Sequence, residues 1–368
     1  MQRRRGYLDW LRGVAVLIMI EAHIVDSWTA DEFRGSTVFA AAIFVGGLGA
    51  PLFLFLAGLA VALSASAKFR RTGDRVAASS AVFGRGLEIF GLAFLFRIQA
   101  WALGWSSPLA LLKVDILNIM GPSIAAAGTL WGLAGSARAR LLAFSGMTLA
   151  LTLLTPLIRY APIQSLPDPV EAYIRPVPYL SNFVFFPWGI FVLAGVIPGL
   201  LLDATPALRE RRMNAYLVAG GLAVSLGSMA AVYIASSYAS SDFWSTSPSY
   251  FFFRAGLMTA GIGVAFAWES RPGGRAKWSP LRQLGRSSLF VYWIHVELVY
   301  GLISRPLHRS LTLTEALIAL SLFSALMLLC SVVKDRTVRL WGETTQPGRV
   351  SDSPPCESVA EAIYNRPS

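Results

Sequence analysis

An arginine and a histidine in the N-terminal apolar segment have the types and the spacing to act on one substrate. Arg12 and His23 have ten residues between them in the stretch 8–27. On a helix, this spacing puts both side chains on one face to within about 20° and separates them by about 16 Å along the axis. A guanidinium can bind an anionic donor at one end of such a helix, while an imidazole exchanges a proton at the other. This pair is the first candidate for a functional site.

Structural explanations compete with a functional role for both residues. Asp9 lies three residues before Arg12, so the two can form an ion pair on one helix face. The Arg12 side chain can also extend along the helix to reach the membrane interface. For His23 a packing role is harder to argue, because Glu21 lies nearby and a polar pair has little reason to be there for packing alone.

Further polar side chains interrupt the apolar segments, and each is a candidate because an unpartnered charge in a membrane is costly. Asp115 and Asn118 share a helix face at i and i+3. An ion pair between Asp115 and either Arg97 or Arg254 is the structural explanation for these groups. Glu88 is interpreted as a buried carboxylate without an assigned partner. The full set is Asp9, Glu21, Glu88, Arg97, Asp115, Asn118, Arg254 and His295.

These side chains must be held by helices that cross a membrane. The chain is 55% hydrophobic and 14% charged, whereas a soluble domain carries about a quarter charged residues. Its apolar runs are long enough to span a hydrocarbon core of about 30 Å as helices, and the alternating pattern of a β-barrel is missing. The sequence therefore predicts an all-α polytopic integral membrane protein with about ten transmembrane helices in one bundle. The expected spans are 8–27, 38–66, 84–103, 111–134, 139–158, 181–202, 214–236, 250–269, 284–304 and 313–334.

The basic residues predict the orientation of these spans. Lys and Arg number 21 in the N-terminal segment, the even-numbered loops and the stretch after the last span, against six in the opposite loops. Because Lys and Arg accumulate on the cytoplasmic side, both termini are expected inside, in the cell inner membrane. The net charge of +11 is thereby explained, and no nucleic-acid partner is expected.

The domain organisation is simple. Residues 1–341 are expected to form one transmembrane domain, and residues 342–368, rich in Ser, Pro, Gly and charge, a disordered cytoplasmic tail. The outer connection 159–180 has five prolines and is expected to be an irregular loop or a short interfacial segment. The three histidines are scattered, so no metal site is expected.

Several segments, taken in order, resemble a family of membrane enzymes. RRRGYLDWLRGVAVLIMIEAH carries an Arg-x10-His signature on Arg12 and His23. GGLGAPLFLFLAGLAVALS, KVDILNIMG, FFPWGIFVLAGVIPG and LGRSSLFVYWIHVELVYG follow. Together, over most of residues 3–304, the chain resembles the transmembrane acyltransferase superfamily, which includes the acyltransferase-3 proteins and relatives of heparan-α-glucosaminide N-acetyltransferase. The middle segments are more similar to bacterial members of the second branch.

The resemblance implies an acyltransferase whose donor is acetyl-CoA or another acyl-CoA, bound from the cytoplasm, with no metal. Arg12 and Arg85, both cytoplasmic cations, are then expected to bind the donor's phosphates. His23 is expected as general base on a hydroxyl or amine of the acceptor, and Asp115 is expected at the catalytic site to orient a partner group. The acceptor implied is an envelope glycan or a lipid-linked saccharide. The loop 26–37 lacks the histidine that the lysosomal enzyme uses, which leaves His23 as the first-choice base.

Two other functions fit the same polar residues. A transporter or flippase would use them to line a path for an anionic solute or a lipid-linked saccharide, and would consume no acyl-CoA. A structural or assembly protein would use them as buried ion pairs that fix helix packing. Membrane lipids are expected partners in every case, and the sequence leaves the oligomeric state open.

Overall fold

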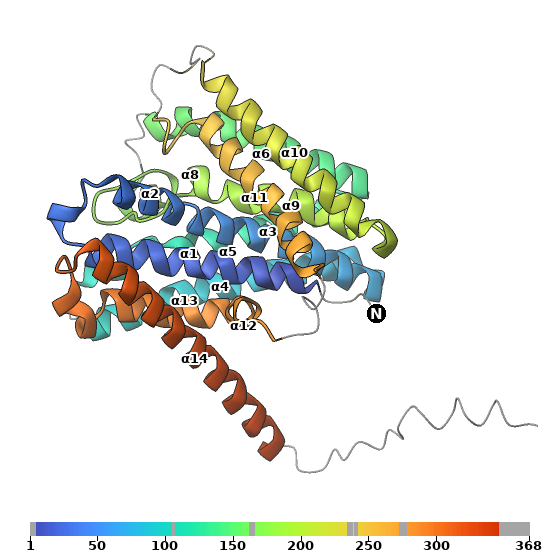
Figure 1. Cartoon of the computed structure of the whole chain (residues 1–368). Coiled ribbons are helices and arrows are strands. Elements are labelled where there is room, and N and C mark those ends of the chain that lie inside the picture. Colours follow the sequence, from blue (N-terminus) through green and yellow to red (C-terminus); the bar gives the residue numbers. More distant parts are fainter. Residues whose placement is uncertain are drawn as a thin grey trace, which may run out of the picture.

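Almost the whole described chain is helical (Figure 1). The computed structural model describes residues 5–104, 107–161, 166–233, 238, 242–271 and 278–345. Within these ranges, β-pairing is limited to two isolated bridges, Thr29 with Leu311 and Val114 with Ser181. The prediction of an all-α protein is confirmed.

Each predicted span coincides with one helix or with two consecutive ones. Three spans are interrupted: 38–66 breaks between α2 and α3, 181–202 between α8 and α9, and 284–304 between α12 and α13. The α-helices are α1 (Gly6–Trp28), α2 (Thr37–Gly46), α3 (Gly49–Thr72), α4 (Arg75–Gly104), α5 (Ile116–Leu133), α6 (Ala137–Tyr160), α7 (Asp168–Ile174), α8 (Phe185–Trp188), α9 (Ile190–Asp203), α10 (Glu210–Ala230), α11 (Pro248–Glu269), α12 (Pro280–Arg286), α13 (Ser288–Tyr300) and α14 (Leu313–Thr345). Short 3₁₀ turns are η1 (Asp31–Phe33), η2 (Pro108–Leu112), η3 (Ala207–Arg209), η4 (Ala231–Tyr233) and η5 (Leu302–Leu307).

The number of membrane-crossing helices is smaller than the sequence predicts. Seven helical segments of the described chain are long and apolar enough to cross a membrane: Thr37–Thr72, Ile116–Leu133, Ala137–Tyr160, Phe185–Asp203, Ala207–Ala230, Pro248–Glu269 and Leu313–Trp341. The expected count of about ten is therefore too high. The three predicted spans that are not among these seven correspond to α1, α4 and α13. Helices α1 and α4 carry several ionisable residues. Helix α13 has 13 residues, whereas a helix needs about 20 to span a membrane. The chain is an all-α, multi-pass membrane protein.

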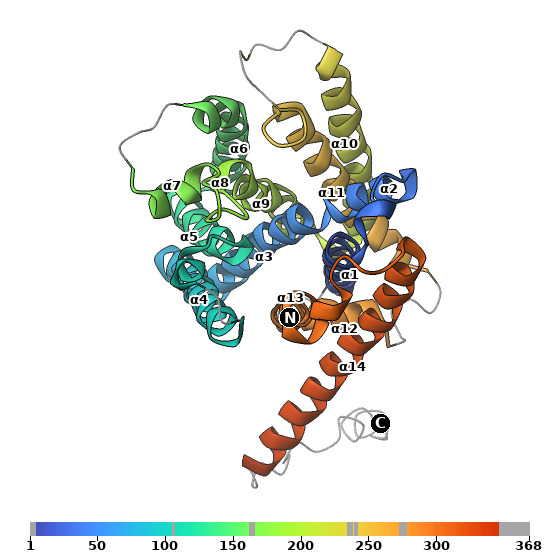
Figure 2. The ribbon, with the colours of Figure 1, turned by 90° about the vertical axis from the view of Figure 1, so that its left-hand side faces the viewer.

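Helix α1 runs through the middle of the bundle because it is apolar on two sides. Leu11 and Met19 belong to a core shared with α3 and α11, whereas Val16, Ile20 and Ile24 belong to a second core with α13 and α14. Figure 2 shows α1 enclosed by α3, α11, α12, α13 and α14. In this position the polar groups of α1 can find protein partners instead of lipid, which offsets the cost of placing them in a membrane.

Two glycines let α12 cross α1 at backbone contact. A Cβ atom on Gly13 would overlap the carbonyl of Leu281, and one on Gly285 would overlap the carbonyl of Asp9. Small residues at such crossings let membrane helices approach closely enough for van der Waals contact. The crossing carries α13 alongside α1, so that side chains far apart in the sequence can meet.

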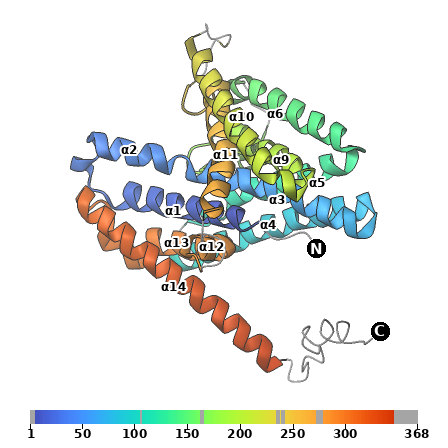
Figure 3. The same cartoon turned by 45° about the vertical axis from the view of Figure 1, so that its right-hand side comes forward.

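The remaining helices pack around this centre. Helices α10 and α11 lie side by side and cross α1 and α3 steeply (Figure 3). The connection 159–180, for which an irregular loop or a short interfacial segment was predicted, contains the short helix α7, and residues 162–165 of it lie outside the described residues. Helix α14 continues to Thr345. Disorder was predicted for residues 342–368; α14 includes the first four of these residues, and residues 346–368 lie outside the described residues.

Candidate active site

A pocket with a volume of about 560 Å³ lies between α1, α3, α4 and α5, beside the start of α13. Its 17 described lining residues include four cations and no carboxylate. The cations are Arg12, Lys68, Arg71 and Arg85. The structure thus brings together Arg12 and Arg85, which the sequence suggested for donor binding. It adds Lys68 and Arg71, which in the sequence served only to predict the orientation of the spans.

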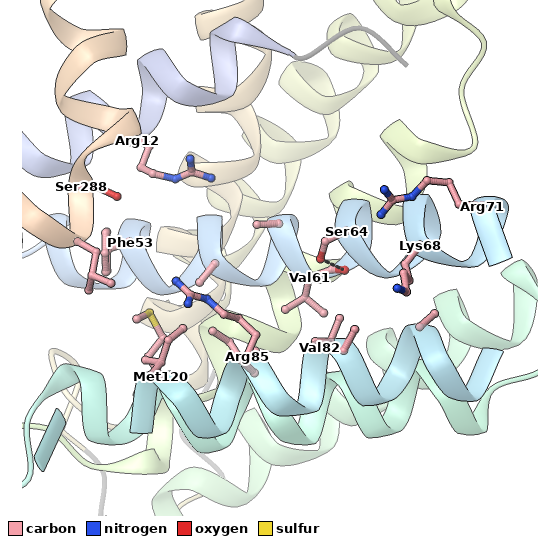
Figure 4. A pocket seen from close by; sticks show the side chains of 17 residues that line it. Arg12, Phe53, Val61, Ser64, Lys68, Arg71, Val82, Arg85, Met120 and Ser288 are labelled. Carbon is pink, nitrogen blue, oxygen red and sulfur yellow. Dashed lines mark hydrogen bonds between the residues drawn. The ribbon is translucent and has the colours of Figure 1, made fainter. Parts of the chain in front are cut away.

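The pocket has a basic end and an apolar end. In Figure 4, Lys68 and Arg71 lie at one end and Phe53 and Met120 lie at the other, and the guanidinium groups of Arg12 and Arg85 project from α1 and α4 into the part of the pocket close to Phe53 and Met120. Along α3, the 18 positions from Phe53 to Arg71 correspond to about 27 Å. Several Arg and Lys side chains in a groove can hold phosphates through charge-assisted hydrogen bonds. The arrangement suits an elongated ligand with anionic groups at one end and an apolar or neutral group at the other.

The helix ends explain why the cations gather here. Lys68 and Arg71 are three residues apart near the end of α3, so they share a face. The negative end of the helix dipole favours cations at this position. The helix ends at Gly73, whose backbone is left-handed with φ of 67°, a conformation that a glycine adopts without strain. Lys68 and Arg71 could have been recognised from this spacing.

The two arginines close to the apolar end of the pocket have different partners. Arg12 donates to the carboxylate of buried Asp9 over 3.1 Å. The ion pair that was considered as a structural explanation for Arg12 is therefore present, and Arg12 also lines the pocket. Arg85 pairs with Glu88 over 2.8 Å, and both side chains are more than half exposed. The interpretation of Glu88 as buried is therefore wrong. An exposed pair of this kind is weak, so Arg85 can exchange Glu88 for an anionic ligand at little cost.

His23 meets α13 in the other half of α1. Its Nδ1 lies 2.9 Å from the hydroxyl of Tyr300, and its ring contacts the ring of His295 edge-on, with 5.2 Å between centroids. His295 is fully buried. The structure therefore joins two of the histidines that the sequence left separate. Tyr300 was missed, because its only sequence signal is its place at the end of a polar, aromatic span.

A row of rings connects this cluster to the pocket. Phe53, which lines the apolar end of the pocket, stacks on Tyr292 with 6.4 Å between centroids. Tyr292 contacts His295 at 5.7 Å, and His295 contacts His23. One aromatic side chain thus lies between the pocket wall and the histidine pair. The arrangement brings the apolar end of the pocket to within one ring, that of Tyr292, of two imidazoles.

Asp115 belongs to a separate ion-pair network. It pairs with Arg97 and accepts from the amide of Asn182 over 2.7 Å, while Asn118 accepts from its backbone N–H over 3.0 Å. Arg97 in turn lies within electrostatic reach of Glu297 on α13. Of Arg97 and Arg254, the two arginines considered as partners of Asp115, Arg97 forms the ion pair. No contact between Asp115 and His23 is found in the described part of the chain, where the ion-pair partner of Asp115 is Arg97.

Arg254 and Glu21 lie apart from the histidine pair. Arg254 is buried against Tyr250, 3.9 Å from the ring centroid, and donates to the carbonyl of Trp244 over 3.2 Å. Glu21 faces α2 near Gly46, and its Oε2 has no hydrogen-bond partner among the described residues. Neither side chain lines the pocket.

Breaking the Asp115–Arg97 pair should destabilise the protein. Both side chains are 11% exposed, so Asp115→Ala leaves a buried guanidinium without its carboxylate, at a cost of about 3–5 kcal/mol. Chemical or thermal unfolding in detergent measures the loss, and Asp115→Leu combined with Arg97→Leu should recover most of it. Glu88→Ala is the matched control, because its exposed pair contributes less than about 1 kcal/mol. Wild-type stability of Asp115→Ala would contradict a structural role for this pair.

Comparison with known proteins identifies a family. The family profile described as "Heparan-alpha-glucosaminide N-acetyltransferase, catalytic" matches residues 4–234, which is more than half of the chain. A search of curated proteins finds no match. The matched range contains Arg12, His23 and most of the pocket lining, whereas His295 and Tyr300 lie beyond it. The chain therefore belongs to the heparan-alpha-glucosaminide N-acetyltransferase catalytic-domain family.

Proposed function

We propose that this multi-pass member of an N-acetyltransferase family transfers an acyl group, with acetyl as the first choice, from acyl-CoA to a hydroxyl or amine of an envelope glycan or a lipid-linked saccharide. One observation carries the proposal: a pocket whose described lining has four cations and no carboxylate ends, at its apolar side, one ring away from a pair of imidazoles. A donor with several phosphates at one end and a reactive thioester at the other matches this order of groups.

Donor binding follows from the charges. Lys68 and Arg71, at the end of α3, would hold the phosphate-rich end, and Arg12 with Arg85 would hold phosphates or carbonyls further in. The thioester would then lie towards Phe53 and the histidines. We assign the Lys68–Arg71 end to the cytoplasm, in the inner membrane with both termini inside, because the basic loops lie there.

Transfer needs a base for the acceptor, and His23 can supply it. If Nδ1–H of His23 donates to the oxygen of Tyr300, the lone pair on Nε2 is available to accept a proton, as in other sites where a third group orients an imidazole. The acceptor would lose its proton to His23 as its oxygen or nitrogen attacks the thioester carbon. A positioned base of this kind contributes about 10²–10⁴-fold to a rate.

Donor binding and turnover by the purified protein test this function. The protein in nanodiscs should bind acetyl-CoA and release free CoA when extracts containing envelope glycans are added, with the acetylated product identified by mass spectrometry. Desulfo-CoA, which keeps the phosphates but has no thioester, should compete for the pocket. No binding at near-millimolar acetyl-CoA would remove the donor assignment. Movement of a glycan lipid across vesicles without CoA release would place the chain among transporters instead.

A further inference from the structure

His295 is a buried histidine, and one of its two ring nitrogens has no hydrogen-bond partner among the described residues. Its Nδ1 lies 2.9 Å from the carbonyl oxygen of Val291, and because a carbonyl only accepts, Nδ1 must carry the hydrogen. The neutral ring then has its lone pair on Nε2. This atom is buried and has no hydrogen-bond partner in the described part of the chain.

An unpartnered acceptor at such a position is costly. A buried polar atom without a partner gives up its hydration without a compensating hydrogen bond, and an apolar residue at 295 would avoid that loss. The free nitrogen belongs to the ring that lies between Tyr292 and His23. The ring of His295 is therefore in contact with both the residue next to the donor pocket and the proposed base, while its Nε2 has no hydrogen-bond partner among the described residues.

Order along α13 separates the tasks of the two histidines. Ser288 lines the donor pocket, Tyr292 stacks on Phe53 of the same pocket, His295 follows one turn later, and Tyr300 at the end of the helix binds His23. The 12 positions from Ser288 to Tyr300 span about 18 Å. His295 thus lies between the donor pocket and the hydrogen bond that orients His23.

We infer that His295 is a second catalytic residue, which receives the acceptor's proton from His23 and delivers it to the sulfur of the departing thiol. The inference rests on the proposed function. It assigns the two proton transfers of the reaction, one at the acceptor and one at the leaving group, to the two histidines in contact.

The step balances without a further reactant. The acceptor O–H or N–H bond breaks, its proton goes to Nε2 of His23, and the acceptor atom forms a bond to the acyl carbon. The carbon–sulfur bond breaks, and its electron pair stays on sulfur. The proton then passes from His23 to Nε2 of His295 and on to sulfur, which requires the two edge-on rings to turn towards each other and Tyr292, which lies between His295 and the pocket wall, to move aside. CoA leaves as the thiol and both imidazoles end neutral.

A change of leaving group separates proton delivery from a structural role. His295→Gln keeps an N–H donor for the Val291 carbonyl but cannot carry the proton, and His295→Asn is measured in parallel as a shorter replacement. With acetyl-CoA, turnover should fall about 100-fold, within the range of a positioned proton-transfer group. With the acetyl thioester of 4-nitrothiophenol, whose thiolate leaves without a proton, the ratio of wild-type to variant rate should shrink below about tenfold. His23→Ala should stay impaired with both donors, because the acceptor still needs its base.

Each outcome is decisive. Wild-type turnover of acetyl-CoA by either His295 variant overturns the inference, and so does an equal defect with both donors, which would mark His295 as structural. Binding of desulfo-CoA at wild-type affinity shows that a variant keeps the pocket. If the wild-type protein neither binds nor consumes acetyl-CoA, the proposed function fails, and that result is distinguishable because it precedes any comparison of variants.

Discussion

Replacement of His23 with alanine is expected to lower acyl transfer from acetyl-CoA by about 10³-fold, in the middle of the range for loss of a general base. The affinity for acetyl-CoA should stay within about twofold of wild type, because His23 does not line the donor pocket. Binding by calorimetry and CoA release under saturating donor separate the two effects. A loss of rate without a loss of affinity is what a catalytic residue produces.

Two variants serve as controls for this result. Tyr300→Phe keeps the ring beside His23 but removes the hydroxyl 2.9 Å from its Nδ1, so it should reduce turnover less than the loss of the imidazole. His308→Ala removes a histidine whose Nε2 lies 2.9 Å from the carbonyl of Val299 and whose ring is not among the described ring contacts of His23, so it should leave the rate nearly unchanged. Turnover by His23→Ala at the wild-type rate would remove the core of the proposed mechanism.

Replacement of Arg12 with glutamine is expected to raise the dissociation constant for acyl-CoA by about 10- to 150-fold, which corresponds to about 1.5–3 kcal/mol for a hydrogen bond to a charged group. Glutamine keeps a polar side chain of similar reach but removes the charge. Asp9 retains Arg286, at 3.8 Å, so its carboxylate is not left without a cation. Calorimetry or a displacement assay with desulfo-CoA measures the change.

Arg70 and Arg71 provide a matched test of the same pocket. They are neighbours in the last turn of α3, but Arg71 lines the pocket whereas Arg70 pairs with Asp203 over 2.7 Å. Arg71→Ala should weaken donor binding in the same direction as Arg12→Gln, and Arg70→Ala should not. Affinity should also fall with added salt, since phosphate contacts near a surface are screened. Equal behaviour of the two alanine variants would mean that net charge, and not the pocket, attracts the donor.

The helical segments and the short-range pairs could be predicted from the sequence. Predicted spans 139–158 and 250–269 differ by at most two residues at either end from α6 (Ala137–Tyr160) and α11 (Pro248–Glu269), because apolar run length and flanking charge are local properties. The Asp9–Arg12 pair was foreseen from its spacing of three residues, which a helix converts into contact. The common face of Arg12 and His23 follows from the same geometry.

Hydropathy did not determine which face of a membrane helix is buried. Lipid-facing and protein-facing positions are both apolar, so the pattern around Glu88 could not place it on the exposed face where it pairs with Arg85. The same limit explains the number of spans. A helix enclosed by protein, such as α1, can keep polar groups that a lipid-facing helix cannot. The break between α2 and α3, inside the predicted span 38–66, does not interrupt the run of apolar residues and so could not be seen from hydropathy.

Which helices meet depends on how they pack in three dimensions. Asp115 pairs with Arg97 and not Arg254 because α4 and α5 pack against each other, and local spacing does not distinguish the two. His23 meets Tyr300, 277 residues away, because α12 crosses α1 at Gly13 and Gly285 and carries α13 alongside. Such contacts depend on the shapes of two surfaces at once, whereas periodicity describes one helix at a time. The sequence therefore identified the chemical groups, and helix packing assembled them into a pocket and a histidine pair.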